Sequence, residues 1–104
     1  MTIDQMKLII SSGKSAERRK AAKKIGINKT TSLGECLLTA YLKESKSPKT
    51  WETQHEMIKA LGLIEYKKAL PIIDNIVGQN QPYSMISNAA AQSYVRLKRK
   101  GFVK

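Results

Sequence analysis

The amino-acid sequence predicts an all-α protein, and three observations support that prediction. The apolar residues in every segment between chain breaks recur at helical spacing, and no segment alternates as a half-buried strand would. Most of the breaks carry serine, threonine or proline, which favour helix starts, or glycine, which favours helix ends. A length of 104 residues fits one domain. We therefore expect a single helical domain over residues 1–104, with a short basic C-terminal tail at 99–104.

The first of six expected helices covers about residues 3–11, and the second follows Ser15. Thr2 and Gln5 stand at capping-box spacing before the first helix, whose apolar face comprises Ile3, Met6, Ile9 and Ile10. Gly13 closes it. The second helix begins after Ser15 and stops at Gly26 and Asn28, because these residue types favour helix ends. One side of the second helix carries Arg18, Ala21, Ala22 and Ile25, and the other side is almost entirely basic.

The third and fourth helices open near residues 32 and 48. Ser32 and Glu35 are again at capping-box spacing, and the stripe that follows comprises Leu33, Cys36, Leu37, Ala40 and Tyr41. Residues 43–46 are the expected polar exit of this helix. Ser47 before Pro48 predicts a fourth helix to about residue 61, with Trp51, Met57, Ile58 and Leu61 as its apolar set. For Trp51 core packing is the expectation and an exposed contact the alternative.

The last two helices are predicted at about residues 68–77 and 82–98. Gly78 ends the fifth helix, and Pro82 opens the sixth. The sixth helix has a stripe at helical spacing that comprises Ile86, Ala89, Ala90, Ser93, Tyr94 and Leu97.

The chain also repeats itself. A shift of 36 residues aligns Ala21, Ala22, Ile25, Gly26 and Ile27 with Met57, Ile58, Leu61, Gly62 and Leu63. The same shift aligns Leu33, Cys36, Leu37, Ala40 and Tyr41 with Ala69, Ile72, Ile73, Ile76 and Val77. A shift of 33 residues aligns Met57, Ile58, Ala60, Leu61 and Ile64 with Ala90, Ala91, Ser93, Tyr94 and Leu97. Self-similarity at such a period indicates stacked helix pairs.

Residues 57–64, followed by Ala69-Leu70-Pro71-Ile72-Ile73, closely resemble a HEAT repeat of the short, lyase-like bacterial type. The resemblance covers about residues 3–98 as three helix pairs. It implies a right-handed α-solenoid whose second helices line a concave face that binds macromolecules. The arginine that the family carries in its second helix is matched by Arg18 but becomes Gln54 and then Ser87, and the family's turn aspartate falls at Tyr66.

The charge is strongly basic, because 19 Lys and Arg oppose 8 Asp and Glu, for a formal net charge of +11. Such a surplus favours acidic partners. The densest cluster comprises Lys14, Arg18, Arg19, Lys20, Lys23 and Lys24, and a second comprises Arg96, Lys98, Arg99 and Lys100. Between them, Glu52 and Glu56 would interrupt a track for nucleic-acid phosphates. Lysine outnumbers arginine 15 to 4, which is poor for bidentate readout, so a protein partner is favoured.

The sequence thus predicts a non-catalytic cytoplasmic module that binds and masks a protein with an acidic surface. In size and architecture it resembles the immunity proteins of bacterial toxin systems, including contact-dependent growth inhibition, and that resemblance implies a toxin domain such as a nuclease as the partner. The expected partner-binding residues are Arg19, Lys20, Lys23, Lys24, Glu52, Glu56, Lys59 and Arg96. No catalytic residue, metal, cofactor or membrane insertion is expected.

Two other classes stay open. One is a basic nucleic-acid-binding helical-repeat protein similar to the HEAT-like DNA glycosylases, and the other is a scaffolding subunit of an enzyme complex.

Overall fold

A computed structural model describes residues 2–78 and 85–102, which fold into six α-helices and three single-turn 3-10 helices. The α-helices are α1 (Ile3–Ser12), α2 (Ser15–Asn28), α3 (Gly34–Glu44), α4 (Trp51–Leu63), α5 (Leu70–Gly78) and α6 (Met85–Phe102). The 3-10 turns are η1 (Thr31–Leu33), η2 (Pro48–Thr50) and η3 (Lys67–Ala69). Because these ranges contain no strand, the all-helical prediction is confirmed.

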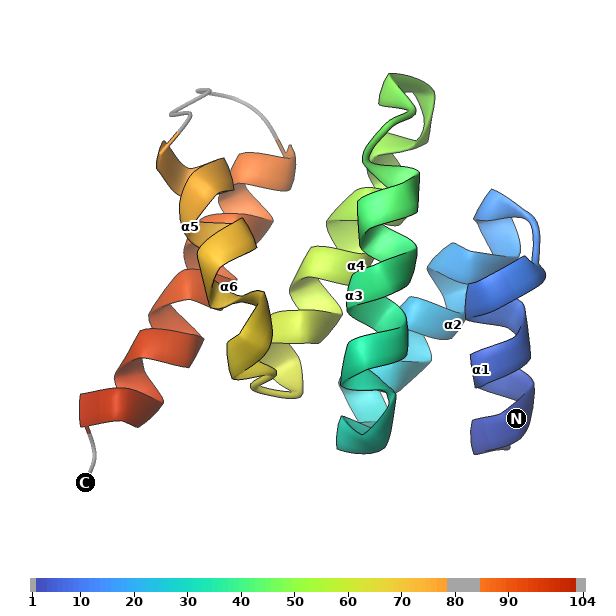
Figure 1. Ribbon diagram of the computed structural model, residues 1–104, viewed down its shortest axis with the longest axis horizontal. Coiled ribbons are helices and arrows are strands. Elements are labelled where there is room, and N and C mark those ends of the chain that lie inside the picture. The colour runs from blue at the N-terminus through green and yellow to red at the C-terminus, as the bar shows by residue number, and fades with distance from the viewer. Residues whose placement is uncertain (1, 79–84, 103–104) are drawn as a thin grey trace.

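The helices form two layers (Figure 1). One layer is a row in which α4 packs against α2 on one side and α6 on the other. In the other layer, α1, α3 and α5 each pack against the helix that follows in the chain, and α1 also contacts α3. The smallest dimension, 18 Å, fits two layers of helices whose axes lie about 8 to 10 Å apart.

The core lies between the layers and follows the predicted stripes. The largest fully buried apolar side chains are Ile10, Ile25, Leu37, Met57, Ile58, Leu61, Ile73 and Leu97. Two expected core residues are exposed instead, Ile3 at 51% and Trp51 at 44%. Each is the first residue of its helix and precedes the buried face, which begins at Met6 in α1 and at Thr53 in α4. The expectation of core packing for Trp51 was therefore wrong.

The 36-residue repeat extends to the backbone. At the end of α2, Lys29 has a left-handed φ of 51°, and the Thr30 N–H donates to the carbonyl of Ile25 at 3.0 Å. At the end of α4, Glu65 has a φ of 56°, and the Tyr66 N–H donates to the carbonyl of Leu61 at 3.1 Å. Both ends are Schellman motifs, and each leads through a 3-10 turn into the next helix.

These turns bear on two predictions about helix ends. The second helix ends at Asn28, one of the two residues expected there, after continuing through Gly26, and the left-handed residue is Lys29. The capping box at Ser32 and Glu35 does not form, because η1 occupies this position and leads directly into α3. The capping box of Thr2 and Gln5 is present as predicted.

Two glycines allow neighbouring helices in the row of α2, α4 and α6 to pack closely. A Cβ at Gly26 would lie 3.1 Å from Cα of Ala60, and a Cβ at Gly62 would lie 2.8 Å from Cα of Ser93. The Ser93 hydroxyl also donates to the carbonyl of Ile58 at 2.8 Å. The sequence shifts of 36 and 33 relate these glycines and their small partners, so the α2–α4 and α4–α6 contacts repeat one another.

The remaining boundaries differ by a few residues. Helix α5 begins at Leu70 because residues 67–69 form η3. The start of the sixth helix at Pro82 lies outside the described residues, and α6 extends to Phe102, so residues 99–102 of the expected tail are helical.

Candidate functional site

The basic surface of α2 faces solvent beside α4. Lys20, Lys23 and Lys24 are exposed, as predicted. Arg19 is half-buried and its Nη1 donates to Oε2 of Glu52 on α4 at 2.9 Å. Because both side chains remain open to water, at 38% and 59%, this ion pair contributes no more than about 1 kcal/mol. It links the basic surface to α4.

A shallow groove runs between α2 and α4. Its floor is made of small residues, Ala22, Gly26 and Ala60, and its sides comprise Lys23, Ile27, Glu56, Lys59 and Leu63. Ile27 is 65% exposed. An exposed apolar side chain among charged neighbours is typical of the centre and rim of a protein–protein interface. We call this groove together with Arg19 and Glu52 the α2–α4 face.

The α2–α4 face contains most of the predicted partner-binding residues. Lys23, Glu56 and Lys59 line the groove, and Arg19 and Glu52 bridge its two helices. The Glu56 carboxylate lies 3.8 Å from Nδ1 of His55. Lys20 and Lys24 are exposed on α2 outside the groove. Arg96 is exposed on α6, beyond α4, and is not part of this face.

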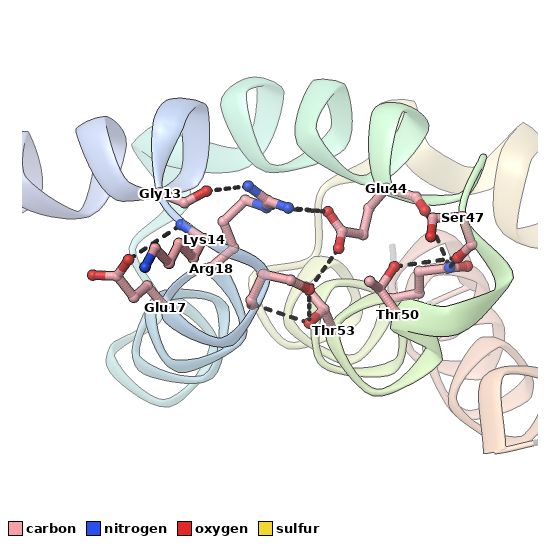
Figure 2. Close-up of polar contacts among 10 residues, drawn as sticks. Gly13, Lys14, Glu17, Arg18, Glu44, Ser47, Thr50 and Thr53 are labelled. Carbon is pink, nitrogen blue, oxygen red and sulfur yellow. Dashed lines mark hydrogen bonds and ion pairs between the residues drawn. The ribbon is translucent and has the colours of Figure 1, made fainter.

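Sequence reasoning missed a buried acid that connects three helices. Glu44 was expected in the polar exit of the third helix, but only 6% of it is exposed. Arg18 on α2 donates to its Oε2 from Nη2 at 2.7 Å and from Nε at 3.0 Å, and Ser15 donates to its Oε1 at 2.7 Å (Figure 2). The Ser15 hydroxyl also lies 2.7 Å from that of Thr53 on α4.

Glu44 is ionised in this network. Burial raises the pKa of the Glu44 carboxyl. Hydrogen bonds from Ser15, Thr50 and Arg18, together with the charge of Arg18, lower the pKa by more than burial raises it, so the net pKa lies below its ordinary value. The position of Arg18 on the packed side of α2 could have indicated such an acid, because a half-buried guanidinium requires an acceptor.

Arg18 and Gln54 have equivalent roles 36 residues apart. Arg18 donates to the carbonyl of Gly13, between α1 and α2, and Gln54 donates to the carbonyl of Ser47, between α3 and α4, at 2.7 Å. Gln54 also donates to the carbonyl of Glu44 at 3.1 Å. Each side chain therefore holds the connection that precedes its own helix.

Among the residues with described positions, no group of three His, Cys, Asp or Glu could hold a metal ion. Cys36 is partly buried, with its Sγ 3.6 Å from Oγ of Ser11. In the same part of the chain, no helix combines the length and apolar character needed to cross a bilayer. Comparisons with protein-family models, with curated proteins and with solved structures gave no match to this chain.

Proposed function

We propose that this protein is a non-catalytic binding module that masks a partner protein through the α2–α4 face. The partner carries an acidic surface, and the arrangement is that of a cytoplasmic immunity protein that neutralises a bacterial toxin. The proposal includes a HEAT-like solenoid of three helix pairs. Its support is the recurrence, at one sequence shift, of the Schellman turns, the 3-10 turns and the glycine contacts.

The observation that carries the functional proposal is the mixed chemistry of the α2–α4 face. Ile27 supplies an exposed apolar contact, and Lys23 and Lys59 stand beside it in the groove. A partner that presents an apolar side chain surrounded by carboxylates matches the exposed Ile27 and the lysines beside it in chemical character. A phosphate backbone would leave Ile27 without an apolar contact, so this face favours a protein.

The proposal is tested by reversing the exposed charges of α2. The variant Lys20→Glu/Lys23→Glu/Lys24→Glu changes only side chains that lie in solvent, so its fold should persist. The full chain serves as bait in nuclease-treated lysate, and the partner is then purified and titrated against it. We expect a stoichiometric complex with the wild type and a much lower association rate with the variant, because rim charges act mainly on association.

A matched control reverses the charge of three lysines elsewhere on the protein. Lys43→Glu/Lys46→Glu/Lys49→Glu alters three exposed lysines near the connection between α3 and α4, away from the α2–α4 groove. Equal weakening by both variants, or no stoichiometric protein complex with the wild type, would contradict the proposal. Replacement of Ile27 by serine should raise the dissociation rate, whereas Leu8→Ser, at a similarly exposed position on α1, should not.

Nucleic-acid binding is the second candidate function. The observation that favours it is a group of exposed lysines, Lys29, Lys67 and Lys68, on the turns that follow α2 and α4.

A further inference from the structure

The C-terminal ends of α2, α4 and α6 lie along one edge of the molecule, the lower edge in Figure 1. The turns that follow α2 and α4 carry Lys29, Lys67 and Lys68, and all three side chains are exposed. We call the two turns, residues 29–31 and 63–68, the turn edge. The sequence adds Lys98, Arg99 and Lys100 in the last part of α6, which is helical to Phe102.

The two turns share a hollow of about 430 Å³. Lys29 and Thr31 line it from the first turn, and the second contributes Leu63, Ile64, Glu65, Tyr66, Lys67 and Lys68. Its lining therefore holds three ammonium groups and one carboxylate. None of the ion pairs formed among the described residues involves Lys29, Lys67 or Lys68.

Local stability explains these lysines only in part. Lys67 and Lys68 lie in η3, just before α5, and the dipole at a helix N-terminus disfavours cations. Lys29 has a left-handed φ that glycine would adopt without strain, although its position at the C-terminal end of α2 favours a cation. The three ammonium groups share one hollow, and an external anion would offset their mutual repulsion.

We propose that the turn edge binds the phosphate backbone of nucleic acid without sequence preference. Cations of two successive helix ends line one hollow here, and phosphates along a nucleic-acid backbone present a row of regularly spaced negative charges to such a surface. Lysine ammonium groups act as point charges toward phosphate and give little base readout. The exposed large apolar residues of the described chain are Ile3, Leu8, Ile27, Leu42, Trp51 and Val95, and none belongs to the turn edge. The hollow adjoins the α2–α4 groove at Leu63, which lines both, but Lys29, Lys67 and Lys68 line the hollow alone.

The test is fluorescence anisotropy with the full chain and a labelled mixed-sequence DNA duplex, repeated over a series of salt concentrations. We expect wild-type affinity to fall steeply with salt and to be similar for duplexes of other sequence. The variant Lys29→Gly/Lys67→Gln/Lys68→Gln should lower the slope of log affinity against log salt by about 3, one unit for each lost lysine contact.

The charge-matched control is Lys43→Gln/Lys46→Gln/Lys49→Gln, which removes three exposed lysines near the α3–α4 connection, at the opposite edge in Figure 1. The control should keep the wild-type slope. Equal slopes in the two triple variants, or no binding by the wild type at low salt, would overturn the proposal.

Two single variants separate binding from folding. Lys29→Gly and Glu65→Gly each relieve a left-handed φ at the same position of the repeat, so neither should unfold the protein. Lys29→Gly should weaken DNA binding and Glu65→Gly should strengthen it, because the first removes a cation and the second an anion from the hollow. A change in the same direction for both would contradict the assignment.

Competition with polyglutamate identifies the class of ligand. DNA should displace the labelled duplex at far lower charge concentration than polyglutamate does. Equal displacement would show that the edge takes acidic polypeptides and would overturn the nucleic-acid assignment. Because the partner complex at the α2–α4 face is measured separately, either proposal can fail without the other.

Discussion

Replacement of Gly62 by alanine tests how closely α4 and α6 pack. An added Cβ would lie 2.3 Å from Oγ, 2.6 Å from Cβ and 2.8 Å from Cα of Ser93, so α6 itself must move. Such overpacking costs about 1 to 3 kcal/mol, and the higher helix propensity of alanine returns about 1 kcal/mol. Because all three contacts are shorter than 3.0 Å and one is with the backbone of α6, we expect the upper part of that range and a net loss of about 1 to 2 kcal/mol.

Gly26→Ala is the matched variant at the equivalent position in α2. Its Cβ would meet Leu63 and Ala60 at 3.0 to 3.3 Å, where a shift of a few tenths of an ångström suffices, so stability should change by less than about 0.5 kcal/mol. Urea unfolding followed by circular dichroism measures both variants. A Gly62→Ala protein as stable as the wild type, or a larger loss for Gly26→Ala, would refute the packing described for this row.

Three further outcomes concern the core and the buried acid. Leu61→Ala should lose about 2 to 5 kcal/mol in urea unfolding, because Leu61 is 1% exposed in the centre of the core, and a melting temperature close to that of the wild type would mean that α4 presents another face. Glu44→Gln should lose about 1.5 to 3 kcal/mol through its hydrogen bonds to Arg18, Ser15 and Thr50, whereas Glu35→Gln, exposed on the same helix, should change stability by less than about 0.5 kcal/mol; equal losses would contradict the network. The lowered pKa of Glu44 also predicts stability that is fully present above pH 4.5, the ordinary pKa of the unfolded group, and lost as pH falls through the lower folded value; unfolding between pH 7 and pH 3 should show a shallower acid loss in Glu44→Gln.

Much of the fold could be predicted because the relevant information is local. Helical periodicity located all six helices and the buried sides of α2 and α3, and the capping box of Thr2 and Gln5 formed as expected. The shift of 36 residues anticipated that Gly26 and Gly62 have equivalent environments. These features depend on residues within one or two turns of each other, or on the repetition of one pattern.

The candidate site depended more on contacts between distant parts of the chain. The sequence identified the basic surface of α2, but only the packing of α2 beside α4 brought Arg19 to Glu52 and placed Lys23 and Lys59 on one groove. Arg96 was expected at the same site, and its helix lies on the far side of α4.

The sequence by itself determined the helical fold, the repeat and the positive charge, because periodicity, glycine placement and composition can be read from the chain directly. The tertiary structure decided which polar residues are buried and which charges share a surface. Glu44 shows the reason: it lies in a polar stretch of the sequence, and it is buried because Ser15 and Arg18 reach its carboxylate from α2 and Thr50 reaches it from η2. Burial of a charge depends on partners that the fold brings together.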